Sequence, residues 1–218
     1  MSRKLFAWLV LVTLLISIGY ASTFAVGGTK DTNELYDYST AVGGTFEYAV
    51  ILALVLWIAG SRQELLALRR PRSRPSTLGL AGLVLLASFV VIEFLLDPFL
   101  HGGREQGVVP THWLPAHAAA FAVNWLVVAG VAPFVEELTY RGLGCSLLFE
   151  RVGKWGAIAA VGLLFAASHG LVQAFPELAT LGCALAWLRW RTRSVYPGML
   201  VHAVFNSIAL ALVLFEPR

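Results

Sequence analysis

The sequence predicts an all-α protein, a polytopic transmembrane helix bundle of about seven spans. Apolar residues make up 58% of the 218-residue chain and charged residues only 13%, whereas a soluble domain carries about 25% charged residues. The apolar residues also gather in runs near the length of about 20 that a membrane-spanning helix needs. This composition excludes a disordered chain, a coiled coil and an ordinary soluble enzyme.

Seven apolar runs, taken in chain order, justify the number of helices. The first run, 5–26, follows the basic residues Arg3 and Lys4. A cleaved signal peptide is the alternative there, but the run is longer than a usual signal core, which favours a retained helix. The other expected helices are 46–60 (of spanning length only if 41–45 joins it), 78–100, 114–149 (which Pro133 can break), 155–175, 178–190 and 199–215.

The basic residues indicate the orientation of the chain. If the N-terminus is cytoplasmic, twelve Lys and Arg residues lie in cytoplasmic segments and three lie in the opposite segments. Cytoplasmic loops of membrane proteins carry such an excess, so we expect a cytoplasmic N-terminus. Topology thus accounts for the basic residues, and no nucleic-acid partner is expected. We expect an integral protein of a bacterial plasma membrane, surrounded by the lipid bilayer.

Polar residues interrupt the apolar runs in the second half of the chain, although an ionised side chain costs about 2.5–3.5 kcal/mol at the bilayer centre. The first group holds Glu136, Glu137, Tyr140 and Arg141. Residues four apart share a helix face, so we expect Glu137 to pair with Arg141. Glu136 faces Tyr140 and has no cationic partner in its own helix, which suits a general base or acid.

Two further groups supply imidazoles and an amide. Phe165 and His169 share one helix face, so the ring can buttress the imidazole, and His202 and Asn206 share another. Each pattern alone is also typical of helix packing. Together, a carboxylate, two imidazoles and an amide are enough to activate a water molecule and stabilise an oxyanion.

In this order the three groups resemble the motifs of the CPBP (CAAX protease and bacteriocin-processing, or Abi) family of glutamic-type intramembrane proteases. The family pattern is Glu-Glu-x-x-x-Arg, then Phe-x-x-x-His, then His-x-x-x-Asn, and the resemblance covers about 126–212. It implies an intramembrane endopeptidase that cleaves a membrane-associated protein or peptide and needs no cofactor.

The resemblance also assigns roles to the residues of the three motifs. It implies that Glu136 and His169 activate a water molecule, and that His202 and Asn206 hold the oxyanion. The supporting residues that it implies are Glu137, Arg141, Phe165 and Tyr140, the last standing where such sequences often carry Phe.

The resemblance divides the chain into N-terminal helices without a specific motif, 1–112, and a catalytic core formed by the last four helices, 113–218. Two alternatives stay open. One is a zinc-dependent membrane peptidase with Glu136, His169 and His202 as metal ligands. The other is a non-catalytic membrane immunity or scaffold protein.

The predicted site contains one geometric conflict. At 1.5 Å per residue, His169 lies about 22 Å from the inner end of its helix, whereas His202 lies only about 5–9 Å into its own. Straight, upright helices would keep the two imidazoles apart. Tilted helices, a deeper start of the last helix or a break near Pro197 would bring them together.

Overall fold

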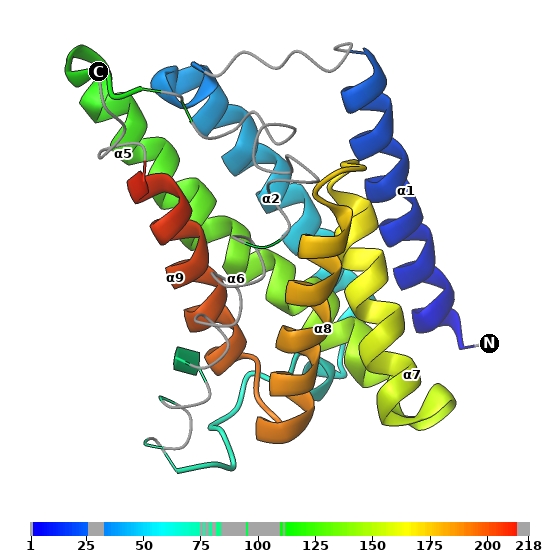
Figure 1. Ribbon diagram of the computed structural model, residues 1–218. Coiled ribbons are helices and arrows are strands. Elements are labelled where there is room, and N and C mark those ends of the chain that lie inside the picture. The colour runs from blue at the N-terminus through cyan, green and yellow to red at the C-terminus, as the bar shows by residue number, and fades with distance from the viewer. Residues whose placement is uncertain are drawn as a thin grey trace.

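The computed structural model describes residues 2–25, 33–74 and 112–212, and six single residues between 76 and 110. The described residues form an all-helical bundle (Figure 1), as the sequence predicts. The expected helix 78–100 lies almost entirely outside the described residues.

Three helices in the described part are long and apolar enough to cross a membrane. They are α1 (Arg3–Ala25), α2 (Tyr38–Ala59) and the continuous run Pro115–Ser168. Two shorter helices follow, α8 (Phe175–Thr192) and α9 (Tyr196–Leu212). These five helical runs agree with an integral membrane protein, but the number of seven spans stays a prediction.

The run Pro115–Ser168 is built from α-helical and π-helical segments. Its parts are the 3-10 turn η3 (Pro115–His117), α5 (Ala118–Leu126), the π segment η4 (Val127–Val131), α6 (Ala132–Glu136), the π segment η5 (Glu137–Gly144) and α7 (Cys145–Ser168). A π turn pairs residues five apart and is frequent at functional sites. The segment η4 ends five residues before Glu136, and η5 begins at Glu137.

Pro133 does not break this run, contrary to the expectation that it could. Proline donates no hydrogen bond and crowds the carbonyl four residues before it. Here the N–H of Ala132 donates to the carbonyl of Val127, five residues earlier. The π turn shifts the carbonyls relative to the α-helical pairing, so the helix passes Pro133 without a break.

Two glycines with positive φ turn the chain around the C-terminal half of the bundle. Gly153 has φ 69° and ψ 175° inside α7, and α7 packs along α8, into which the next turn leads (Figure 1). α7 ends at Ser168 instead of continuing to 175, because the turn contains Gly170 with φ 68°. A Cβ at Gly170 would also clash with the backbone of Gly19 in α1, so glycine fits here for two reasons.

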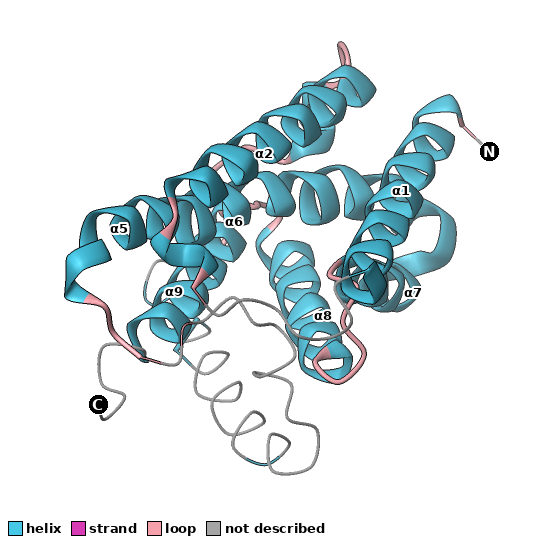
Figure 2. Cartoon of the chain, turned by 90° about the horizontal axis from the view of Figure 1, so that it is seen from above, coloured by secondary structure: helices cyan, strands magenta, loops and turns pink. Residues whose placement is uncertain are grey.

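The centre of the bundle is η5. All eight of its residues are buried, and it contacts α1, α2, α7, α8 and α9. Seen from above, these helices surround the α6–η5 region (Figure 2). The fold therefore places the charged residues of the first motif away from the lipid-facing surface.

Helix α1 is fixed to this centre by Trp8. The indole is fully buried, and its Nε1–H donates to the carbonyl of Thr139 at 2.9 Å. A Cβ on Gly144 would overlap the same indole. The N-terminal helix thus packs directly against the segment that carries the glutamates.

We expect Trp8→Phe to lower the free energy of unfolding by about 1–3 kcal/mol, because a hydrogen bond to a buried carbonyl is lost. Thermal unfolding of the full chain in detergent micelles measures this change. Trp57→Phe is the matched control, since Trp57 lies on α2 with 75% of its surface exposed. Equal midpoints for both variants would contradict the role given to Trp8.

Candidate active site

The two adjacent glutamates have different partners. Glu137 is fully buried, and its Oε1 lies 2.9 Å from Nη1 of Arg141. The Glu136 side chain is 17% exposed, and its Oε1 accepts a hydrogen bond from the Tyr48 hydroxyl at 2.8 Å. The predicted pairing of Glu137 with Arg141 is confirmed. Glu136 is the carboxylate that remains partly exposed.

The ring of Phe165 connects the three motifs. It is fully buried in α7 and packs edge to face with His169, His202 and Tyr140, at centroid distances of 4.7, 5.7 and 5.4 Å. The guanidinium of Arg141 lies 4.2 Å from its centroid, within cation–π range. The predicted contact between Phe165 and His169 is confirmed, and the same ring brings His202 to the group.

His169, the residue directly after α7, is held in one tautomer by a carbonyl of that helix. Its Nδ1 lies 2.8 Å from the carbonyl oxygen of Phe165. A carbonyl can only accept, so Nδ1 carries the hydrogen and Nε2 of the neutral ring is an acceptor. The imidazole also interacts electrostatically with Glu136. His169 therefore presents an acceptor nitrogen, Nε2, near Glu136.

His202 faces both glutamates. Its Nε2 lies 3.8 Å from Oε2 of Glu136, and its Nδ1 lies 3.4 Å from Oε1 of Glu137. α9 can come this close because residue 198 is a glycine: a Cβ there would clash with Oε2 of Glu137. The carboxylates of α6 and η5 and the imidazole of α9 thus form one cluster.

Asn206 lies one turn after His202 and points to a π segment. Its Nδ2 donates to the carbonyl of Val128 in η4 at 2.8 Å. An amide nitrogen carries two hydrogens, so this contact uses one donor and leaves a second. The bond with Val128 orients the amide.

The structure brings His169 and His202 to the same ring, although their places in their helices suggested that they could lie apart. α9 begins at Tyr196, three residues before the expected start. The preceding residues Ser194 and Val195 are buried, and the N–H of Val195 donates to the carbonyl of Ala67 at 3.3 Å. The last helix therefore starts among buried residues without a break at Pro197, and both imidazoles reach the Phe165 ring.

The contribution of α2 to the site was not predicted from the sequence. Tyr48 binds Glu136 directly, and the neighbouring Glu47 interacts with it electrostatically. The available signal was a carboxylate and a hydroxyl, Glu47-Tyr48, at the start of the apolar run 46–60, because ionisable residues in such runs need a reason.

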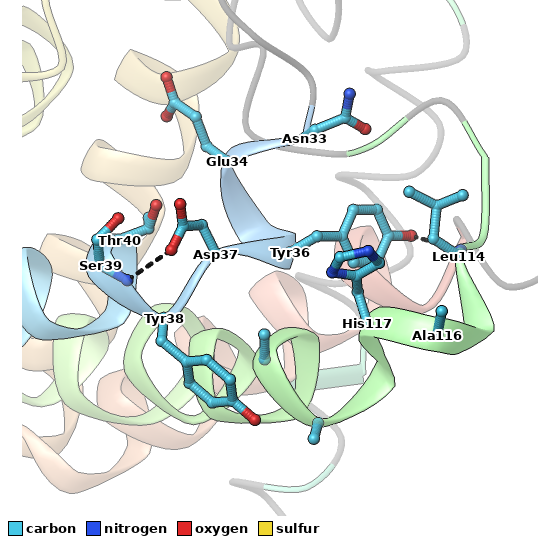
Figure 3. A pocket seen from close by; sticks show the side chains of 12 residues that line it. Asn33, Glu34, Tyr36, Asp37, Tyr38, Ser39, Thr40, Leu114, Ala116 and His117 are labelled. Carbon is cyan, nitrogen blue, oxygen red and sulfur yellow. Dashed lines mark hydrogen bonds between the residues drawn. The ribbon is translucent and has the colours of Figure 1, made fainter.

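Two cavities adjoin α2, one at its N-terminal end and one along its side. One of about 880 Å³ lies at the N-terminal ends of α2 and α5, where Asp37, Tyr36 and His117 face it (Figure 3); none of the motif residues lines it. The other, of about 540 Å³, is apolar and lies between α2 and the segments η4 and α6. It is lined by Thr45, Tyr48, Ala49, Leu52, Leu126, Gly130, Val131, Phe134 and Val135.

A zinc peptidase would need several ligand side chains arranged around one metal ion. Among the described residues, no group of three or more His, Cys, Asp or Glu side chains is arranged to hold a metal ion. Oε1 of Glu136 is bonded to Tyr48, Nδ1 of His169 contacts the carbonyl of Phe165, and Nδ1 of His202 faces Glu137. These contacts leave Oε2 of Glu136 and Nε2 of each histidine, so zinc binding stays an alternative for experiment.

A bundle with long apolar helices that buries an ion pair beside two histidines defines a polytopic membrane protein with an internal polar site. Residues 118–208 match the family model described as type II CAAX prenyl endopeptidase Rce1-like. This segment is therefore similar to an Rce1-like domain of the CPBP family, the family that the motifs predict.

The matched segment contains all three motifs and does not include α1 or α2. The family is one of peptidases, and a protein or peptide is the substrate class that it implies. No curated protein and no solved structure matches the chain significantly.

We expect Arg141→Met to destabilise the protein by about 3–5 kcal/mol, because it leaves Glu137 buried and unpaired. Unfolding in mixed micelles of detergent and sodium dodecyl sulfate measures the change. Arg62→Met is the matched control: the Arg62–Glu64 pair has the same 2.9 Å separation but is 59% and 60% exposed, and such pairs contribute little. Equal effects at both positions would contradict the structural role of the buried pair.

Proposed function

We propose that the chain is an intramembrane endopeptidase that hydrolyses a peptide bond of a membrane-associated protein or peptide with a glutamate-activated water. The proposal rests on the different partners and exposure of the two adjacent glutamates. Glu137 is neutralised by Arg141 in a closed environment, whereas Glu136 is partly exposed beside His202. A general base needs a free lone pair and room for the water it activates.

Glu136 and His169 activate the water in this proposal. Oε1 of Glu136 is already occupied by Tyr48, so Oε2 is the oxygen that takes a proton from water. Nε2 of His169 is an acceptor and holds the second hydrogen of the same water, because Nδ1 is bonded to the Phe165 carbonyl. The hydroxide oxygen then attacks the carbonyl carbon of the substrate.

His202 and Asn206 stabilise the oxyanion that forms. The second N–H of the Asn206 amide remains after the bond with Val128, and the His202 role requires that Nε2 carry a proton. Donors aimed at a developing negative charge are worth about 2.7–4 kcal/mol each. When the tetrahedral intermediate collapses, the C–N bond breaks and the proton on Glu136 passes to the leaving amine.

The apolar cavity beside Tyr48 supports access from the membrane. It lies between α2 and α6, next to the residue that binds Glu136. Apolar parts of a membrane-associated substrate can occupy this groove while an extended peptide segment reaches Glu136. An extended segment is needed because a peptide bond within a helix is shielded by its own hydrogen bonding.

The location and the division of the chain are part of the proposal. The apolar helices and the excess of basic residues on one side support a bacterial plasma membrane protein with a cytoplasmic N-terminus. The motif set supports a catalytic core at 113–218. The packing of Trp8 against η5 indicates that the N-terminal helices, 1–112, support this core.

We expect Glu136→Gln to lower the cleavage rate by about 10²–10⁴-fold, because it keeps the shape of the side chain and removes the base. Substrates are found by comparing the termini of membrane proteins in cells with and without the active chain. Cleavage of one such substrate by the full chain in lipid vesicles is then measured for each variant.

Glu64→Gln is the control, since Glu64 is exposed in the short helix η2 (Gln63–Leu66). Full cleavage by the Glu136→Gln variant would contradict the proposed activity and favour a non-catalytic immunity or scaffold protein. Loss of wild-type cleavage in chelator, with recovery on adding zinc, would favour the zinc peptidase instead.

A further inference from the structure

Tyr48 contacts the proposed base from outside the segment that matches the family. It lies on α2, whereas the match begins at 118. Its hydroxyl donates to Oε1 of Glu136 at 2.8 Å. Hydrogen bonds to a carboxylate are about twice as strong as neutral ones, so this contact decides how Glu136 is oriented.

The hydrogen bond distinguishes the two oxygens of Glu136. A carboxyl group at the end of a flexible side chain can rotate and exchange its oxygens. With Oε1 bound to Tyr48, Oε2 is left facing Nε2 of His202 at 3.8 Å. Only Oε2 is then directed toward the imidazole side of the cluster, where the water is placed.

The other groups around Glu136 do not replace this contact. Those that interact with it electrostatically are Glu47 and Tyr48 of α2, Tyr140 of η5, His169 directly after α7 and His202 of α9. Glu47 repels the carboxylate. Tyr140 packs its ring on Phe165, and the histidines lie on the water side.

We propose that Tyr48 is a positioning residue of the site, whose hydroxyl binds Oε1 of Glu136 and thereby selects Oε2 as the oxygen that accepts the proton from water. This inference rests on the proposed peptidase function. It assigns to the N-terminal helices a direct part in the chemistry, in addition to their packing role.

The test compares Tyr48→Phe with wild type in the vesicle cleavage assay, with kcat and KM measured separately. Phenylalanine keeps the ring and removes only the hydroxyl. We expect kcat to fall on the order of tenfold with KM unchanged, because substrate contacts remain and the base is no longer oriented. Replacement of Tyr48 by p-aminophenylalanine, which restores an N–H donor at the same position, should recover most of kcat.

Tyr36→Phe is the matched control. The Tyr36 hydroxyl also makes a 2.8 Å hydrogen bond, to the carbonyl of His112, at the end of the bundle away from Glu136. We expect this variant to keep the wild-type kcat. Unfolding midpoints of both tyrosine variants are measured in the same vesicle lipids solubilised in detergent.

The outcomes separate this inference from the proposed function. A wild-type kcat for Tyr48→Phe, while Glu136→Gln is inactive, would overturn the role of Tyr48 alone. A loss of kcat that follows a lower unfolding midpoint and is not recovered by p-aminophenylalanine would also overturn it, in favour of a packing role. Full activity of Glu136→Gln would remove the proposed function and this inference together.

Discussion

The buried ion pair between Glu137 and Arg141 is the interaction on which the rest of the site depends. Both side chains are fully buried, so neither charge has water to replace its partner. Arg141 lies against the Phe165 ring and donates to the carbonyl of Gly182 in α8 at 3.2 Å. Glu137 faces His202. One pair thus connects η5 with α7, α8 and α9, and it leaves Glu136 as the carboxylate available for chemistry.

The sequence predicted the parts of the site that lie within single helices. Spacing of four residues placed Glu137 with Arg141 and Phe165 with His169, because such neighbours meet whatever surrounds the helix. It could not predict Tyr48, since the contact with Glu136 depends on how α2 packs against α6. Nor could it predict that His202 faces both glutamates, because this depends on how α9 packs against α6 and η5.

The sequence predicted the all-helical class of the fold, but it predicted the ends of the helices less well. Hydropathy identified the helical runs, because the composition of a spanning segment is constrained by lipid. The helix ends were wrong where backbone geometry decides them: α7 stops at Ser168 because of the turn at Gly170, and the π turn of η4 carries the helix past Pro133. Periodicity contains no signal for a π turn, since the added residue shows only in the backbone.

The proposed mechanism requires that Glu136, His169, His202 and Asn206 surround one hydrolysed peptide bond. The most direct measurement is an experimental structure of the full chain with a phosphinic analogue of an identified substrate, whose tetrahedral phosphorus imitates the attacked carbon. We expect one phosphinate oxygen within hydrogen-bond distance of Glu136 and the other facing His202 and Asn206. An analogue bound elsewhere in the bundle, with Glu136 still facing only Tyr48 and His202, would contradict it.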